Sequence, residues 1–313
     1  METQLNNNVI MSVSGITKRY GKYTVVNNAS FELESGKIYG FIGQNGAGKT
    51  TIIRMLAGYA KANGGTISIF GDSTASGLAA GRKRMGIIVE NPALYKNMNA
   101  YDNLKIQMTL YGIKSDTLVD ELLELVGLAD VGKRKVKNFS LGMRQRLGIA
   151  MTLVNNPEIL VLDEPVNGLD PMGIVEVREL LLKLNRERGI TILISSHILA
   201  ELYQLATDYI IIHNGCILER LTLEELDKKC NSYVVLQTEK LEEAKAIVSQ
   251  MGITDIQDGD NGYFRFPATC DAKEVAQKLT DAGILLTHFS VQTESLEDYF
   301  VKLIGGAGYG KTV

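Results

Sequence analysis

Residues 43–50 read Gly-Gln-Asn-Gly-Ala-Gly-Lys-Thr and match the phosphate-binding loop pattern G-x-x-x-x-G-K-[ST] at every position. The segment 37–42 before the loop predicts a short buried strand, and residues 51–57 after it predict a helix closed by Gly58. A strand that runs through glycines into a helix start directs several backbone N–H groups and the positive helix end at one point. This arrangement is typical of a triphosphate site.

The residues of this loop have separate expected roles. The glycines let the backbone approach the phosphates, Lys49 is expected to reach the β- and γ-phosphates, and the Thr50 hydroxyl to be a ligand of Mg²⁺. The bare pattern arises by chance in roughly one chain in a hundred of this length, and the flanking strand and helix make chance rarer still. The nucleotide contacts predicted here are Gly43, Gln44, Asn45, Gly46, Ala47, Gly48, Lys49, Thr50 and Thr51.

Length and composition narrow the class of protein. A chain of 313 residues suggests about two domains. Its 33 Lys and Arg against 36 Asp and Glu give a net charge of −3, which offers no electrostatic reason to expect a nucleic-acid partner. No apolar run reaches the ~18 residues of a transmembrane helix, and no secretory signal is recognisable. Three widely spaced cysteines predict neither a disulfide framework nor a zinc site. We therefore expect a cytoplasmic protein.

A second apolar segment is followed directly by two adjacent acidic residues. Residues 159–162, Ile-Leu-Val-Leu, predict a buried parallel strand, and Asp163 and Glu164 follow it at the edge where ligands bind in α/β folds. Adjacent carboxylates repel one another unless a cation is near, and beside a phosphate loop that cation is expected to be Mg²⁺. Strand alternation turns neighbouring side chains to opposite faces, so Asp163 is predicted to hold the metal through water and Glu164 to activate the attacking water.

Four further residues have both a structural and a functional interpretation. Tyr20 either stacks on an adenine ring, a contact worth ~1–3 kcal/mol, or packs on the sheet. Ser140 caps a predicted helix over 140–155 and could also contact an anion at that helix end. His197 follows a buried strand at the same sheet edge, which favours a γ-phosphate contact over a surface histidine. Glu90 follows an apolar strand, where its own context favours a solvated loop acid over a metal ligand.

The chain changes in character after residue 226. Helical patterns over about 95–157 predict a helical subdomain within a first domain of residues 1–226. Residues 231–313 then predict the order β-α-β-β-α-β and a last helix, a split-βαβ, ferredoxin-like pattern in a small α+β accessory domain. The expected elements there are strands over 234–237, 253–257, 263–266 and 285–292 and helices over 242–250, 272–282 and 295–303.

Taken together, these pieces resemble the nucleotide-binding subunit of an ABC transporter over about residues 8–226. The loop at 43–50 corresponds to the Walker A motif, and Asp163 and Glu164 correspond to the end of Walker B. The resemblance implies an α/β fold of the P-loop NTPase class. It also implies that Tyr20 stacks on the adenine and that His197 is the switch histidine, so that Lys49, Glu164 and His197 form the catalytic set.

Two more motifs of the family have counterparts in this chain. The segment 139–143, Phe-Ser-Leu-Gly-Met, takes the place of the Leu-Ser-Gly-Gly-Gln signature, keeping its serine and second glycine but replacing the first glycine and the glutamine. Leu169 and Asp170 match the D-loop. The resemblance therefore implies nucleotide contacts from Ser140, Gly142 and Asp170.

Glu90 stands in the loop where the family normally carries a glutamine. With Ser-Leu-Gly-Met-Arg-Gln-Arg at 140–146 and Ser-Leu-Glu-Asp-Tyr-Phe at 295–300, it resembles the bacitracin-resistance and lantibiotic-immunity exporter branch. A glutamine offers Mg²⁺ a neutral oxygen, whereas a glutamate offers a full charge. The predicted metal ligands are thus Thr50, Asp163 and Glu90, and the implied cargo is a peptide antibiotic.

The family also implies an assembly. Two chains would form a head-to-tail dimer with each ATP between one Walker A loop and the other chain's signature. Permease subunits would place the protein on the inner face of the membrane. The alternatives are an importer subunit for a small nutrient, a soluble ABC ATPase acting on ribosomes or DNA, and a non-hydrolysing nucleotide-binding module. Soluble ABC ATPases carry tandem cassettes or long coiled-coil insertions, which this sequence lacks, and Glu164 and His197 argue against the non-hydrolysing module.

Overall fold

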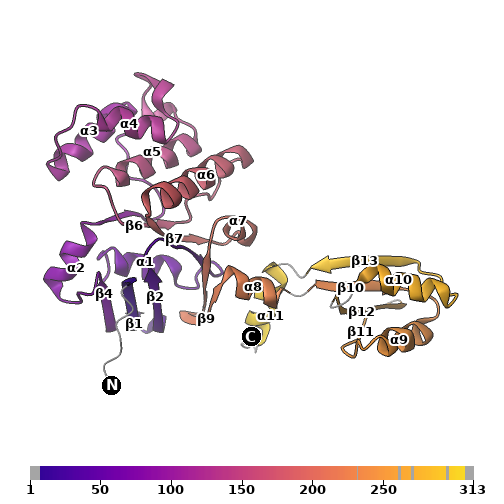
Figure 1. The fold of residues 1–313 in the computed structure, drawn as a ribbon. Coiled ribbons are helices and arrows are strands. Elements are labelled where there is room, and N and C mark those ends of the chain that lie inside the picture. Colours follow the sequence, from indigo (N-terminus) through magenta and orange to yellow (C-terminus); the bar gives the residue numbers. More distant parts are fainter. Residues whose placement is uncertain (1–7, 231, 260–261, 269–270, 294–295, 307–313) are drawn as a thin grey trace. The chain divides into compact units, whose positions relative to one another are not determined.

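The computed structural model describes residues 8–230, 232–259, 262–268, 271–293 and 296–306 (Figure 1). The chain divides into two compact units, Met1–Leu223 and Glu224–Val313. Within the described residues, no helix has both the length and the apolar character needed to cross a membrane.

The first unit is built on a six-stranded sheet in the order β5-β6-β7-β3-β8-β9. The first five strands in this order are parallel, and β9 returns antiparallel to β8 through a hairpin. Asn214 and Gly215 in that hairpin have φ values of 47° and 78°, as a type I′ turn requires. The strands are β3 (Ile38–Ile42), β5 (Met85–Ile88), β6 (Ile159–Asp163), β7 (Thr191–Ser196), β8 (Asp208–His213) and β9 (Cys216–Thr222).

A smaller antiparallel sheet in the order β2-β1-β4 accompanies the large one. Its strands are β1 (Val9–Tyr20), β2 (Tyr23–Glu34) and β4 (Gly64–Ile69). Strands β1 and β2 stay paired up to Tyr20 and Tyr23, so Tyr20 ends a strand beside the hairpin turn.

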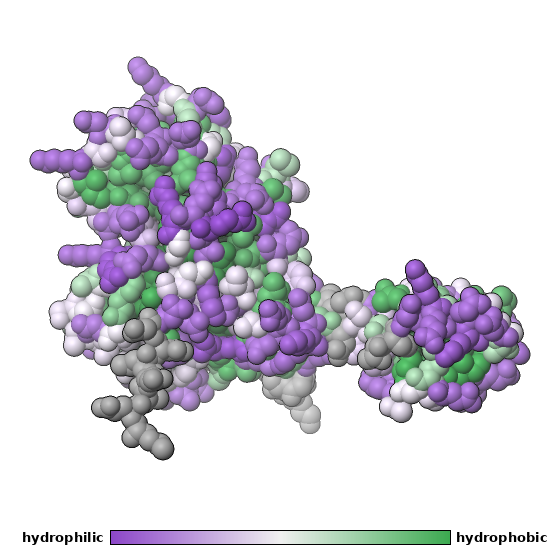
Figure 2. Space-filling model, in the orientation of Figure 1, coloured by the Kyte–Doolittle hydropathy of each residue, from purple (hydrophilic) through white to green (hydrophobic). Residues whose placement is uncertain are grey.

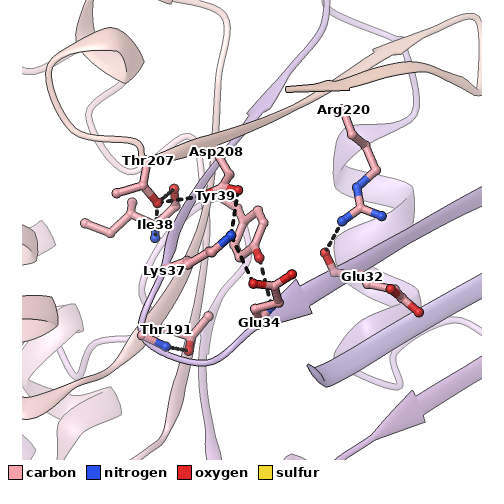
Figure 3. A network of polar contacts seen from close by, with 10 residues as sticks. Glu32, Glu34, Lys37, Ile38, Tyr39, Thr191, Thr207, Asp208 and Arg220 are labelled. Atoms are coloured by element: carbon pink, nitrogen blue, oxygen red, sulfur yellow. Dashed lines mark hydrogen bonds and ion pairs between the residues drawn. The ribbon is translucent and has the colours of Figure 1, made fainter. Parts of the chain in front are cut away.

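A network of hydrogen bonds and ion pairs links β2 to the large sheet (Figure 3). It lies at the start of β3, the end opposite the phosphate loop. The Lys37 ammonium lies 3.0 Å from Glu34 Oε2 and 3.1 Å from Asp208 Oδ1, and the Glu34 N–H donates to the Tyr39 hydroxyl at 2.8 Å. Burial disfavours the charged form of Lys37, but the hydrogen bonds to both carboxylates outweigh it and raise its pKa above the ordinary value. The network therefore stabilises the start of β3, the strand that leads into the phosphate loop.

Helices cover the large sheet and extend beyond it. In Figure 1, α3, α4 and α5 gather at the top of the view, with α6 between them and the sheet. Helix α2 had no counterpart among the expected elements, because Gly77 and Gly81 weaken its helical pattern. The helices are α1 (Lys49–Leu56), α2 (Ala75–Arg82), α3 (Ala100–Tyr111), α4 (Leu118–Leu125), α5 (Leu141–Leu153), α6 (Pro171–Arg188) and α7 (Leu199–Tyr203).

The second unit contains an antiparallel sheet in the order β11-β12-β10-β13 with α9 and α10 packed against it around one core, which is the predicted ferredoxin-like fold. The expected strand over 253–257 is wrong, because Ile253 packs into the core after α9 and only two residues pair as β11. The elements are α8 (Leu223–Lys229), β10 (Ser232–Gln237), α9 (Leu241–Gln250), β11 (Gln257–Asp258), β12 (Tyr263–Pro267), α10 (Ala272–Asp281), β13 (His288–Thr293) and α11 (Leu296–Gly306).

Candidate functional site

The phosphate loop connects β3 to α1, as the sequence predicts. Two of its glycines are required by the chain's own packing, because a Cβ at Gly43 would lie 2.6 Å from the Ile212 carbonyl oxygen and one at Gly48 3.0 Å from the Val25 carbonyl oxygen. Gly46 has a φ of 83° and open space around it. The loop is therefore packed closely on its inner side, and the backbone at Gly46 remains accessible to a ligand.

Lys49 is the buried cation of the site. Its ammonium donates to the Gly43 carbonyl and lies 3.3 Å from Glu164 Oε1. The phosphate loop and the paired acids are thus brought into contact at the carboxyl edge of the sheet, where β3, β7 and β6 end side by side. A lysine held in this way can exchange the carboxylate for a phosphate oxygen.

Asp163 ends β6 with its side chain 1% exposed. Its Oδ1 accepts a hydrogen bond from the Ser195 hydroxyl at 2.7 Å, while the buried Oδ2 has no hydrogen-bond partner among the described residues. A buried carboxylate oxygen without a partner carries a desolvation cost, so the atom suits a cation or its bound water.

The oxygen atoms at this edge of the sheet are of the kind that bind Mg²⁺. The described residues contain no group of three or more His, Cys, Asp or Glu that could hold a metal by itself. Magnesium is typically held by one or two carboxylates together with phosphate oxygens and water. The Asp163 carboxylate and the Thr50 hydroxyl beside a triphosphate loop supply that kind of oxygen.

Glu164 follows the strand in a left-handed backbone conformation with a φ of 50°. Its Oε2 lies 2.7 Å from His197 Nδ1, and the histidine nitrogen is the donor because an ionised carboxylate can only accept. Asp163 and Glu164 therefore have different partners. The turn at Glu164 gives them different surroundings, because the residue lies beyond the last strand position and strand alternation does not reach it.

Ser195 was not among the predicted site residues. Its hydroxyl donates to Asp163 Oδ1 and accepts from the Glu164 backbone N–H at 2.9 Å, so it fixes both acids. The parallel pairing of Asp163 with Ser195 across β6 and β7 brings them together. In the sequence, the one indication that Ser195 belongs to the site was the pair of serines directly before His197.

Glu90 has a protein cation as its partner in this structure. Its side chain is 58% exposed, and its Oε1 lies 2.6 Å from a guanidinium nitrogen of Arg54, in the last turn of α1. Its backbone also has a left-handed φ of 63°. Helix α1 therefore carries Lys49 at its start and the partner of Glu90 at its end.

The signature and D-loop segments lie together at two helix starts. Ser140 caps α5 by accepting from the Met143 N–H at 3.1 Å, and Asp170 caps α6 by accepting from the Gly173 N–H at 2.9 Å. A Cβ at Gly142 would lie 3.7 Å from the Gly173 Cα, so the two starts are close neighbours. The capping interpretation of Ser140 is thus observed, and it leaves the helix end available for an anion.

Tyr20 is a surface residue near the hairpin turn between β1 and β2. The residue is 47% exposed, and the Lys18 ammonium lies 5.0 Å from the ring centroid. The residue is therefore not part of the core under the small sheet, and a ring face is accessible for stacking.

A groove lies beside the Glu90 loop, between β5 and the helices α3 and α5. It encloses about 470 Å³. Figure 2 shows hydrophobic residues on the surface of the helical part in this view, among hydrophilic ones. The lining includes Ile88, Pro92, Gln107, Tyr111 and Met151.

Comparison with known proteins places these features in a family. Residues 26–167 match the ABC transporter family. The chain is 43% identical to the bacitracin transport ATP-binding protein BcrA of Bacillus licheniformis, over 96% of this chain and 99% of that protein. It is 42% identical to the lantibiotic transport ATP-binding protein SrtF of Streptococcus pyogenes, over 73% of this chain and 99% of that protein. A solved ATP-binding subunit of an ABC transporter superposes with a TM-score of 0.62 at 29% identity, covering 70% of this chain and 92% of the other.

Proposed function

The chain belongs to the ABC transporter family as an ATP-binding and ATP-hydrolysing subunit, and we propose that it drives a separate permease that exports a peptide antibiotic. The observation that carries the proposal is the contact of Lys49, Glu164 and His197 at one sheet edge. The cargo class, bacitracin or lantibiotic type, is supported by the similarity to transport proteins for such peptides over nearly their full lengths.

The geometry suggests how the chain's residues would act on ATP. The triphosphate would lie on residues 43–51 at the start of α1, and Lys49 would turn from Glu164 to the phosphates. That exchange would free Glu164 Oε1 to accept a proton from the attacking water, while the 2.7 Å contact with His197 keeps the carboxylate oriented. His197 is also our candidate for the γ-phosphate contact.

Magnesium would be held by the Thr50 hydroxyl, by the unpartnered oxygen of Asp163 and by Glu90. When bound, the ion neutralises charge on the β- and γ-phosphates. Asp163 is already in place, since Ser195 fixes its other oxygen. Glu90 would first have to leave Arg54.

We propose that the working unit is a head-to-tail dimer. Ser140, Gly142 and Asp170 sit at the starts of α5 and α6, where backbone N–H groups and helix dipoles favour an anion. They would contact the nucleotide of a second chain, and Tyr20 would stack on the adenine of its own. The nucleotide-binding domain would comprise residues 1–226 with its helical subdomain over about 95–157, and residues 231–313 would be accessory.

The permease would dock in the groove beside Glu90. The loop after Glu90 contributes Asn91 and Pro92 to the lining, so a movement of that loop would reach the docked partner. This contact would hold the protein on the inner face of the membrane from the cytoplasmic side. We propose no nucleic-acid partner.

The cargo is tested by deleting the gene in its own host. Deletion should lower the inhibitory concentration of bacitracin or of a lantibiotic, because the peptide would no longer be removed. The parent gene should restore resistance, whereas a Glu164→Gln copy should not. Unchanged sensitivity across a panel of such peptides contradicts the cargo class and leaves the ATPase assignment standing.

We expect Glu90→Ala to uncouple hydrolysis from transport. ATP affinity should stay within about twofold, because the phosphate contacts remain, while cellular resistance falls to the level of the deletion. Glu90→Gln keeps an oxygen ligand and should lose ATPase activity only modestly. Resistance is measured by inhibitory concentration and affinity with a fluorescent ATP analogue.

Arg54→Ala is the matched control for this prediction. If Glu90 acts only by pairing with Arg54, both alanine variants should lose resistance equally. A metal-coupled role predicts that Arg54→Ala keeps it, since Glu90 is then free of its competing cation. Parent-like resistance in Glu90→Ala contradicts the role altogether.

A further inference from the structure

Gln145 is a buried polar residue that the proposed chemistry does not use. It lies in the second turn of α5, and its side chain is 4% exposed. Its amide nitrogen donates to the Pro165 carbonyl at 2.9 Å, and its amide oxygen is buried without a hydrogen-bond partner in the described part of the chain. A leucine or methionine here would remove the unsatisfied oxygen but would leave the buried Pro165 carbonyl without its donor. The distinctive contribution of the amide is therefore its bond to Pro165.

The carbonyl that Gln145 holds belongs to the residue directly after Glu164. Pro165 leads into the short turn that returns to the Asp170 cap of α6, and the Asn167 N–H donates to the Glu164 carbonyl within that turn. The Gln145–Pro165 bond is thus a fixed link between α5 and the loop that carries the proposed base.

The same helix is packed closely at two other places. Ser140 is its cap at one end. Further along, a Cβ at Gly148 would lie only 2.4 Å from the Pro92 Cβ, so the helix backbone lies directly against the loop that follows Glu90. A movement of α5 therefore cannot occur without displacing Pro165, Pro92 or both.

We propose that Gln145 is a positioning residue that couples the two ATP sites of the dimer. This inference rests on the proposed head-to-tail dimer, in which Ser140 of a chain contacts one nucleotide while Glu164 of that chain serves the other. Binding at Ser140 would shift α5, and the Gln145 amide would transmit the shift to the loop of Glu164. Occupancy of one site would thereby align the base in the other.

The first test is Gln145→Met, which keeps side-chain length and removes the amide. We expect kcat to fall about tenfold, because a small misplacement of a catalytic group is costly, while ATP affinity stays within about twofold. The parent should hydrolyse ATP with a Hill coefficient above 1, and the variant should approach about 1, since coupling between sites is lost.

Thr191→Val is the matched control. Thr191 is fully buried and accepts a hydrogen bond from the Gly36 N–H at 2.8 Å, at the opposite end of the parallel sheet from the site. The variant loses a partly buried hydrogen bond between a side chain and the backbone without touching α5. It should lower the melting temperature and leave both kcat and the Hill coefficient as in the parent.

The pH dependence of kcat in Gln145→Glu distinguishes a positioning role of this residue from a purely packing role. An ionised carboxylate cannot donate to the Pro165 carbonyl, but a protonated one can, and burial raises the pKa of such a group. Its kcat relative to the parent should therefore rise as pH falls from 8 to 6, whereas that of Gln145→Met should stay constant relative to the parent.

The outcomes distinguish this inference from the proposed function. The inference is overturned if Gln145→Met keeps the parental Hill coefficient, if Thr191→Val reproduces its kinetic loss, or if Gln145→Glu shows no recovery at low pH. Each of these results leaves the ATPase and its dimer intact. A parent that hydrolyses ATP with a Hill coefficient of about 1 and forms no ATP-dependent dimer overturns the dimer and the coupling together.

Discussion

Glu164→Gln is expected to bind ATP as the parent does and to hydrolyse it at least about a hundredfold more slowly. The amide cannot accept a proton from water, but it keeps the size of the side chain and can still meet His197, which lies 2.7 Å from the carboxylate. Because ATP would then persist between two chains, the variant should accumulate as an ATP-bound dimer. Phosphate release measures the rate, and size-exclusion chromatography with light scattering measures the mass.

Glu158→Gln is the control at the other end of the same strand. Glu158 lies just before β6, at the end away from the site, and its carboxylate pairs with Arg84 at 2.6 Å. This variant should hydrolyse ATP at the parental rate and show no trapped dimer. Hydrolysis by Glu164→Gln at the rate of the parent would mean that another group accepts the proton.

Lys49→Ala is expected to weaken ATP binding about tenfold to a hundredfold, the range lost with one or two charge-assisted hydrogen bonds. The buried ammonium touches only the Gly43 carbonyl, the Gln44 carbonyl and the Glu164 carboxylate among the contacts recorded for it, so its removal also leaves Glu164 without that cation. Calorimetric titration with MgATP measures the loss, and circular dichroism checks that the fold is retained.

The exposed Lys61→Ala serves as the matched control, since it removes the same charge away from the loop. Its ATP affinity should equal that of the parent. If Lys49→Ala also binds ATP with parental affinity, the phosphates do not depend on this lysine, and the triphosphate assignment of residues 43–50 is wrong.

The sequence predicted those parts of the fold that depend on short, continuous patterns. The phosphate loop and the apolar strand before Asp163 were predictable because local apolar runs and glycines determine them. The placement of the paired acids near the phosphate loop was predictable because parallel strands share one carboxyl edge.

The features that could not be predicted depend on contacts between residues that are far apart in the sequence. The Arg54–Glu90 pair joins residues 36 apart, and nothing in either segment indicates it. The role of Ser195 depends on the register of β6 against β7, which a sequence does not state. Helix α2 was missed because its glycines serve packing, as at Gly81, where a Cβ would lie 2.6 Å from the Ile69 side chain.

Glu90 and Glu164 share the left-handed backbone described above, with φ values of 63° and 50°. Such a conformation costs a residue other than glycine roughly 1 to 2 kcal/mol. In a library of variants sorted for heat resistance, glycine and asparagine should therefore be enriched at both positions. Under the proposed export function, sorting for resistance to the exported peptide should remove them. A lineage that no longer meets such a peptide would then be free to lose these two glutamates first, and their loss would raise its thermal stability.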